Sequence, residues 1–225
     1  MTENMPKSLV PIIGEPFIGH QLRLLRSKGI KRVVLCAGFL GKRIEEFVGD
    51  GARFGIGVSY SFDGGTLLGT AGAIRKALPL LDEAFFVLYG DSYLECDYGR
   101  VAEAFESSQR RGLMTIYRNA GHFDASNVEV QDGLIVRYDK RNRSSAMQHI
   151  DYGLGVFARS VFVNLAPNEC HNLPAVYEDL LQTGELASYE VTNRFYEIGS
   201  LTGIRDLEER LTEHNPTTSE AVRTE

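Results

Sequence analysis

The sequence predicts one large α/β domain in which an α/β first half is followed by a strand-rich second half. A chain of 225 residues is long enough to bury a single substantial core. Strand-like and helix-like segments alternate through the first half, and consecutive strand-like segments follow without a Pro/Ser-rich linker. We therefore expect a single domain over residues 1–212 and a disordered tail over 213–225, where apolar periodicity is lost.

The opening MTENMPKSLVPIIGEP contains helix breakers and predicts an extended loop rather than a helix or strand. A helix is expected over 16–29, which begins with proline, repeats apolar residues at helical intervals and stops at glycine. Strands are expected at KRVVLCAG (31–38), GVSYSF (57–62) and AFFVLYGD (84–91). The third is continuously apolar, as in a central parallel strand covered on both faces.

Two further helices are expected over 69–81, after a glycine turn, and over 98–112, which ends at glycine. Three strand-like stretches then follow at 113–119, 126–140 and 149–157. The Asp132–Gly133 dipeptide inside the second stretch predicts a tight hairpin.

Composition excludes several classes of function. The net charge of -6 argues against nucleic acid or an anionic membrane as a partner. No segment approaches the roughly 18 apolar residues of a membrane span. Cys36, Cys96 and Cys170 are too widely spaced for a zinc site or a disulfide framework, which favours a reducing cytoplasm.

Asp91 is the clearest candidate for chemistry, because ligands of open α/β sheets bind at the carboxyl ends of strands. It follows an apolar strand, with Gly90 directly before it. A carboxylate at a strand tip, reached by close backbone approach at a glycine, is how a divalent cation is held beside phosphates. The alternative is that Asp91 only caps the next turn.

Three other stretches contain candidate residues. LGTAGAI (68–74) offers small residues and helix N-terminal N–H groups to a ligand, or forms a simple tight turn. In RYDKRN, Asp139 and Lys140 are expected to point to opposite faces of a strand end, or to form a solvated charge pair. In RFYEIGS, Glu197 is a carboxylate in an apolar strand that needs a partner or a metal, unless it faces solvent.

Taken together, six motifs resemble the sugar-1-phosphate nucleotidyltransferases in identity and order: TENMPKSL, LGTAGA, GDS, YDK, DYGLGVF and YEIGS. The resemblance covers nearly the whole chain apart from the tail and is greatest to the branch acting on mannose- or heptose-type sugar 1-phosphates, often with GTP. It implies a Rossmann-like mixed sheet flanked by helices, with a smaller inserted sheet for the sugar. It also implies attack of the sugar 1-phosphate on the α-phosphorus of a nucleoside triphosphate, with release of pyrophosphate.

The resemblance further implies the roles of individual residues. Asp91 and Glu197 would hold Mg²⁺, with Glu where relatives commonly have Asp, and Lys7 would contact phosphate. The nucleotide side would be formed by Gly69, Thr70 and Gly90. The sugar and its phosphate would meet Asp139, Lys140, Asp151 and Gly153. Oligomers are compatible with this family.

In the family, the T-x-x-x-P-K-x-L stretch follows a first β-strand and a glycine-rich G-G-x-G-T-R-L loop that cradles the triphosphate. This sequence begins just after that loop. The absent first strand would lie centrally, between the strands at 31–38 and 84–91. A start codon assigned too far downstream and a true truncation are the two explanations, and the chain as written is expected to be inactive.

Two other functions remain open at this point. A catalytically inactive sugar-nucleotide-binding or regulatory module would fit the missing loop, although the retained Asp91, Lys140 and Glu197 argue against it. A nucleotide-sugar glycosyltransferase usually carries a D-x-D motif, whereas GDS contains a single Asp.

Overall fold

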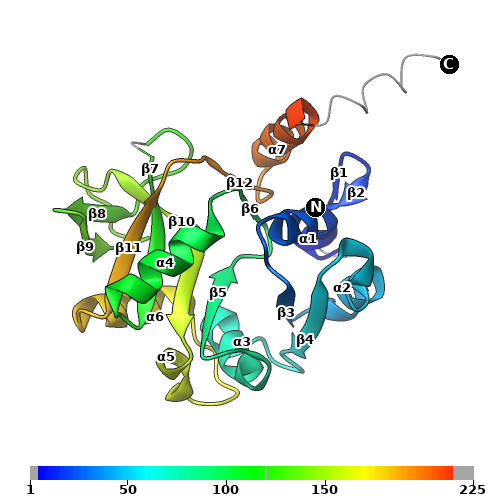
Figure 1. The fold of residues 1–225 in the computed structure, drawn as a ribbon, viewed down its shortest axis with the longest axis horizontal. Coiled ribbons are helices and arrows are strands. Elements are labelled where there is room, and N and C mark those ends of the chain that lie inside the picture. Colours follow the sequence, from blue (N-terminus) through cyan, green and yellow to red (C-terminus); the bar gives the residue numbers. More distant parts are fainter. Residues whose placement is uncertain (1–4, 120, 215–225) are drawn as a thin grey trace.

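The structure is a computed structural model that describes residues 5–119 and 121–214 (Figure 1). Its α-helices are α1 (Phe17–Ser27), α2 (Gly41–Val48), α3 (Gly69–Ala77), α4 (Tyr98–Ser108), α5 (Ser160–Val163), α6 (Leu173–Gln182) and α7 (Leu201–His214). Short 3₁₀ turns lie at Lys7–Leu9, Ala52–Phe54 and Leu78–Leu80. None of these helices is long and apolar enough to cross a membrane.

The strands form one large sheet and three two-stranded sheets. The large sheet contains β5 (Ala84–Leu88), β7 (Gly112–Arg118), β8 (Val128–Gln131), β9 (Leu134–Tyr138), β10 (His149–Ala158) and β11 (Leu186–Val191). The small sheets pair β1 (Pro11–Ile12) with β2 (Glu15–Pro16), β3 (Arg32–Ala37) with β4 (Gly57–Phe62), and β6 (Ser92–Leu94) with β12 (Phe195–Glu197). The mixed sheet with flanking helices confirms the predicted fold class.

β10 organises the large sheet. It pairs antiparallel with β5, β7 and β8, while β7 pairs in parallel with β11. Its register shifts between Asp151 and Gly155, where the strand bulges. β8 and β9 form the predicted hairpin, with Asp132 and Gly133 both in the left-handed region at φ 52° and 77°. The β-rich second half therefore continues into the sheet of the first half through the β5–β10 pair.

The ends of several elements differ from their predicted positions. The opening is not wholly a loop, because it contains the 3₁₀ turn at Lys7–Leu9 and the β1–β2 hairpin. The helix predicted over 98–112 ends at Ser108, since Gln109 adopts a left-handed φ of 54°. α7 extends to His214, beyond the predicted start of the tail; residues 215–225 lie outside the described part of the chain.

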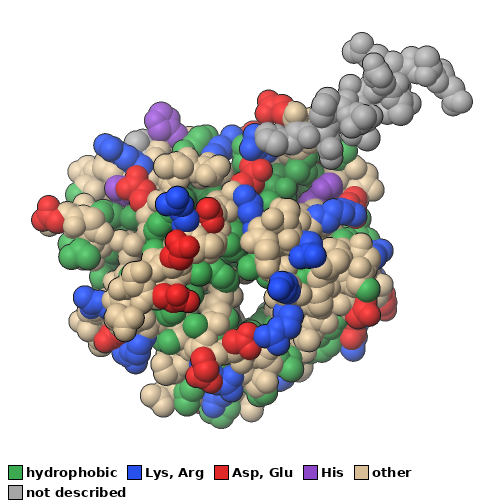
Figure 2. All heavy atoms as spheres, in the orientation of Figure 1, with side chains coloured by type: hydrophobic (Ala, Val, Ile, Leu, Met, Phe, Trp, Pro, Cys, Tyr) green, Lys and Arg blue, Asp and Glu red, His purple; other side chains and the backbone are tan. Residues whose placement is uncertain are grey.

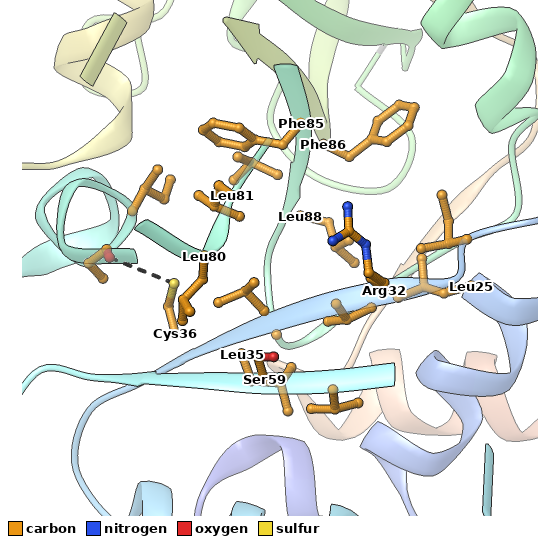
Figure 3. A pocket seen from close by; sticks show the side chains of 18 of the residues that line it. Leu25, Arg32, Leu35, Cys36, Ser59, Leu80, Leu81, Phe85, Phe86 and Leu88 are labelled. Carbon is orange, nitrogen blue, oxygen red and sulfur yellow. Dashed lines mark hydrogen bonds between the residues drawn. The ribbon is translucent and has the colours of Figure 1, made fainter. Parts of the chain in front are cut away.

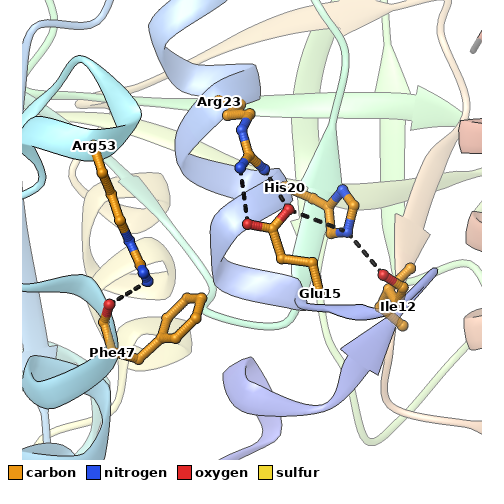
Figure 4. Close-up of polar contacts among 6 residues, drawn as sticks. All are labelled: Ile12, Glu15, His20, Arg23, Phe47 and Arg53. Carbon is orange, nitrogen blue, oxygen red and sulfur yellow. Dashed lines mark hydrogen bonds and ion pairs between the residues drawn. The ribbon is translucent and has the colours of Figure 1, made fainter.

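The β1–β2 hairpin is tied to α1 by polar contacts (Figure 4). The Glu15 carboxylate accepts two hydrogen bonds from the Arg23 guanidinium, and these lower the pKa of Glu15. The His20 ring lies against the carbonyl oxygen of Ile12, 2.9 Å from Nε2. Because the hairpin follows the 3₁₀ turn directly, these contacts fix the path of the chain that carries Lys7.

β5 does not have the two parallel neighbours expected of a central strand. Within the described residues it pairs only with β10, and β3 pairs only with β4. A cavity of about 1010 Å³ lies between β3 and β5, and Figure 2 shows it as an opening through the molecule. Its walls include Leu35, Phe86 and Leu88 (Figure 3). Val33 also lines it.

The cavity lies between β3 and β5, the two strands between which the sequence led us to expect a further strand. Arg32, the first residue of β3, bonds to Asp82, two residues before β5, at 2.7 Å, so both strands begin at the same edge of the cavity. The two strands have not closed together, although unpaired strand edges favour pairing. Tyr98 also lines the cavity, and its buried hydroxyl has no hydrogen-bond partner among the described residues.

Candidate active site

Asp91 and Glu197 meet at the carboxyl end of β5. Asp91 follows that strand after a two-residue turn and precedes β6. β6 pairs antiparallel with β12, which places Glu197 opposite Ser92. The Ile198 N–H donates to the Asp91 carbonyl oxygen at 3.0 Å. Backbone pairing therefore brings together two carboxylates that lie far apart in the sequence.

Several charged side chains lie close enough to Glu197 to shift its pKa. The pKa of Glu197 is raised, first by burial and then by the negative charges of Asp91 and Asp124. The positive charges of Lys7 and Lys140 act in the opposite direction. A divalent cation would remove the repulsion between the carboxylates.

The donor set fits Mg²⁺. The described residues contain no group of three or more His, Cys, Asp and Glu side chains placed to hold a metal. Mg²⁺ is commonly bound through one or two carboxylates, with water and substrate phosphates completing its shell. Asp91 and Glu197 can supply those two carboxylates.

Lys7 lies beside the same carboxylates. Its Nζ is 3.6 Å from Asp91 Oδ2, and its side chain is 54% exposed, so the charge can reach a ligand. The 3₁₀ turn at Lys7–Leu9 fixes its backbone, while Leu9 packs against the buried apolar cluster that includes Leu22 and Leu94. The fold therefore brings Lys7 and Asp91 side by side, and their catalytic roles stay a prediction.

Lys140 and Asp151 form a second charged pair. Lys140 Nζ is 3.3 Å from Asp151 Oδ2, and the Asp151 side chain is only 2% exposed. The Tyr138 hydroxyl donates to Asp151 at 3.2 Å, and the Gly153 N–H donates at 3.0 Å. Gly153 has a φ of +96°, which favours glycine at that position.

Asp139 lies in the turn after β9. Its Oδ1 accepts from the N–H groups of Arg141 and Asn142, each at 2.8 Å. These backbone hydrogen bonds hold the pKa of Asp139 down to about 2. Asp139 and Lys140 are not on a strand end as expected, because β9 stops at Tyr138.

Gly69 and Thr70 begin α3 and pack against the loop before α6. A Cβ on Gly69, whose φ is +68°, would come within 2.6 Å of the His171 carbonyl oxygen. The Thr70 hydroxyl accepts from the Leu173 N–H at 2.7 Å. Both residues, like Gly90, line the cavity between β3 and β5. They lie along the open part of the molecule, whereas Asp91 directly precedes β6 and Glu197 ends its partner strand β12.

Asp124 was not identified from the sequence, although its charge acts on Glu197. It lies in the loop between β7 and β8, where the Asn119 amide donates to the Asp124 carbonyl oxygen and accepts from the Phe123 N–H at 3.1 Å. Asn119 is fully buried. An asparagine directly after an apolar strand and before a polar stretch is the sequence signal that could have pointed to this loop.

The model of the nucleotidyl transferase family matches residues 1–213. The N-acetylmuramate alpha-1-phosphate uridylyltransferase of Neisseria meningitidis is 23% identical over 92% of this chain and 89% of its own length. The D-glycero-alpha-D-manno-heptose 1-phosphate guanylyltransferase of Campylobacter jejuni is 27% identical over 80% of this chain and 77% of its own.

Some other curated relatives are longer, and the chain spans only 28% to 59% of their length. Among solved structures, HddC from Yersinia pseudotuberculosis complexed with GMP-PN superposes with a TM-score of 0.79. That match has 20% sequence identity and covers 94% of this chain and 92% of the other. The two proteins therefore share a fold.

Proposed function

This chain belongs to the nucleotidyl transferase family, and from that premise we propose that it transfers a nucleotidyl group from a nucleoside triphosphate to a sugar 1-phosphate. The products would be a nucleotide sugar and pyrophosphate. One observation carries the proposal: Lys7, Asp91 and Glu197 gather at the carboxyl end of β5, and the charge of Lys140 reaches the same point. Two cations and two carboxylates are what a reaction between two phosphate-bearing substrates requires.

The chain's own residues have separate roles in this reaction. Asp91 and Glu197 would hold Mg²⁺, which would neutralise charge on the triphosphate and polarise the α-phosphate. Lys7 binds phosphate oxygens next to that position. Lys140 binds the phosphate of the sugar, which offsets the repulsion between the two anionic substrates. Positioning and charge neutralisation of this kind supply most of the catalysis in phosphoryl-type transfer.

The remaining candidate residues shape the two substrate sites. Gly69, Thr70 and Gly90 form the nucleotide side, where small residues allow close approach of a base to the backbone. Asp139, Asp151 and Gly153 lie on the sugar side. The heptose relative, a guanylyltransferase, supports GTP and a mannose- or heptose-type sugar as the finer proposal. The three unpaired cysteines support a reducing cytoplasm as the compartment.

We also infer that activity needs a further strand in the cavity between β3 and β5. Lys7 lies at the carboxyl end of β5, so a strand parallel to β5 would leave the cavity near the start of the described chain. A segment upstream of residue 1 can therefore fill the cavity and continue into the loop that holds the triphosphate. With the cavity open, a binding module without catalysis is the second candidate function.

The test is release of pyrophosphate from a panel of nucleoside triphosphates and hexose 1-phosphates, using the native gene with its upstream reading frame included. We expect one pairing to release pyrophosphate in a Mg²⁺-dependent way. Asp91→Asn should abolish release, while Asp132→Asn, the same change in the distant β8–β9 hairpin, should not. Nucleotide-sugar binding without pyrophosphate release would instead support the binding module.

A further inference from the structure

The Asp151 carboxylate is buried, although it lies on the sugar side of the site. Its side chain is 2% exposed, so a ligand that enters from solvent does not touch it. A buried carboxylate is costly unless hydrogen bonds and a counter-charge compensate it. The groups that compensate the Asp151 charge therefore indicate the role of this residue.

Three donors of this chain surround Asp151. Oδ1 accepts from the Gly153 N–H at 3.0 Å, while Oδ2 accepts from the Tyr138 hydroxyl at 3.2 Å and lies 3.3 Å from Lys140 Nζ. The bulge in β10 between Asp151 and Gly155 shapes this arrangement, since Gly153 turns its N–H back to the carboxylate. The carboxylate is occupied by the protein rather than offered to a sugar hydroxyl.

Lys140 is the member of this cluster that solvent reaches. Its side chain is 40% exposed, and its Nζ lies 5.6 Å and 5.8 Å from the ring centroids of Tyr89 and Tyr138. Tyr89 directly precedes Gly90 and Asp91. Asp151 on the inner side and two aromatic rings beside it thus hold the ammonium facing the end of β5.

Asp139 supports the same arrangement by holding the backbone of the turn after β9. Its carboxylate accepts two N–H groups of the turn at 139–142, and Arg137 lies 3.4 Å from its other oxygen. These bonds fix the turn from which Lys140 extends. Asp139 therefore shapes the turn, and Lys140 is left as the residue that faces a ligand.

We propose that Asp151 is a positioning residue, which holds the Lys140 ammonium in place for the phosphate of the sugar 1-phosphate and makes no sugar contact itself. The proposal rests on the proposed function for the identity of the ligand. It changes the expected role of Asp151 from sugar binding to alignment of a cation. Asp139 supports the same cation by fixing its turn.

The tether itself can be tested without any ligand. Amine labelling of the native chain, followed residue by residue by mass spectrometry, should modify Lys140 more slowly than exposed Lys31. Asp151→Asn should increase the labelling rate of Lys140 several-fold and leave that of Lys31 unchanged. Asp132→Asn, a matched loss of one carboxylate elsewhere, should change neither. An unchanged Lys140 rate in Asp151→Asn would overturn the proposal.

A double-mutant cycle tests the functional half, using calorimetric binding of mannose 1-phosphate and glucose 1-phosphate to the full chain with Mg²⁺ present. If Asp151 acts through Lys140, Asp151→Asn should weaken binding about as much as Lys140→Met, and the double variant should bind no worse than Lys140→Met alone. Additive losses would show that Asp151 contacts the sugar and would overturn the proposal.

Two further results distinguish failure of the proposal about Asp151 from failure of the proposed function. Lys140→Met leaves a buried carboxylate unpaired, so its melting temperature is compared with that of the double variant, which removes both charges. If the native chain binds neither hexose 1-phosphate, the proposed function fails for these sugars. The labelling result still decides whether Asp151 holds Lys140.

Discussion

The large sheet around β10 and the β3–β4 pair are both built from apolar strands. They differ in whether the edges of these strands are hydrogen-bonded to neighbouring strands. β10 has hydrogen-bonded neighbours along both edges, and its residues Leu154 and Phe157 are fully buried. Among the strands that the structure describes, β3 has one neighbour, and Val33 and Leu35 are only half-buried beside the cavity. Asp91 and Glu197 are held by the β6–β12 pair and Lys140 by the turn after β9, whereas Gly69, Thr70 and Gly90 line the open region.

Filling the cavity should have the largest effect. A version of the chain extended upstream by an apolar strand should gain pyrophosphate release and a higher melting temperature, because each large buried side chain contributes about 1.5–3 kcal/mol. The measurements are thermal unfolding and the pyrophosphate assay on both versions. An extension of equal length with charged residues on both faces is the control. Equal melting temperatures for the two extensions, or an in-frame stop codon upstream of Met1, would contradict this prediction.

Asp91→Asn tests the paired region directly. In the extended version, it should reduce the chemical step by orders of magnitude while the fold remains, because the amide cannot hold a divalent cation as the carboxylate does. Single-turnover kinetics at several Mg²⁺ concentrations, with thermal unfolding alongside, provide the measurement. Mg²⁺-dependent turnover at the native rate would refute the metal assignment.

Two leucine truncations compare the regions by stability. Leu113→Ala, at a fully buried position of β7, should cost about 2–5 kcal/mol. Leu35→Ala removes a side chain that already lines the cavity, so it should cost about 1 kcal/mol or less. Urea unfolding of both variants gives the two values. In the extended version, the cost of Leu35→Ala should rise toward that of Leu113→Ala; equal costs in the unextended chain would argue that the cavity is closed in solution.

Lys140→Ala should raise the KM for the sugar 1-phosphate by an amount equivalent to about 2–3 kcal/mol, the size of a lost charge-assisted contact. The effect on the nucleoside triphosphate should be smaller, because Lys140 pairs with Asp151 on the sugar side. Steady-state kinetics with each substrate varied in turn make the comparison. A change confined to the nucleotide would reassign Lys140.

The smallest effect concerns Glu197, whose raised pKa means that its charged form is disfavoured in the folded state. As pH rises through the carboxyl range, this group should therefore lower the free energy of unfolding. Without Mg²⁺, Glu197→Gln should be more stable than the native chain at pH 7, and the difference should vanish at acidic pH. Urea unfolding at both pH values measures this. Glu103→Gln, at an exposed position of α4, is the control. No gain in stability for Glu197→Gln at pH 7 would contradict the repulsion between the clustered carboxylates.

Much of the fold could be predicted because local patterns and tertiary packing agree. The apolar runs that became β3, β4 and β5 and the Asp132–Gly133 hairpin lie where the sequence placed them. The open edge of β5 could not be read from its own residues, because an apolar strand looks the same whether its neighbour is present or absent. It was expected only from the resemblance to a nucleotidyltransferase family.

The site was partly predictable for a similar reason. Asp91 and Glu197 stand out as carboxylates beside apolar strands, and pairing of β6 with β12 joins them. The burial of Asp151 and the turn-capping by Asp139 depend on a bulge and on backbone N–H directions, which leave no residue signal. Asp124 depends on the path of a loop fixed by Asn119.

The pairing of β6 with β12 also means that the Asp91 and Glu197 carboxylates come together late in synthesis and folding. During synthesis Asp91 leaves the ribosome early, but its partner Glu197 emerges 106 residues later (197 minus 91). Contacts that span so much sequence form slowly, because the ends of a long loop must first be brought together. A nascent or C-terminally clipped chain would therefore carry Asp91 and Lys7 without the second carboxylate, and would complete the proposed metal site only when β12 docks.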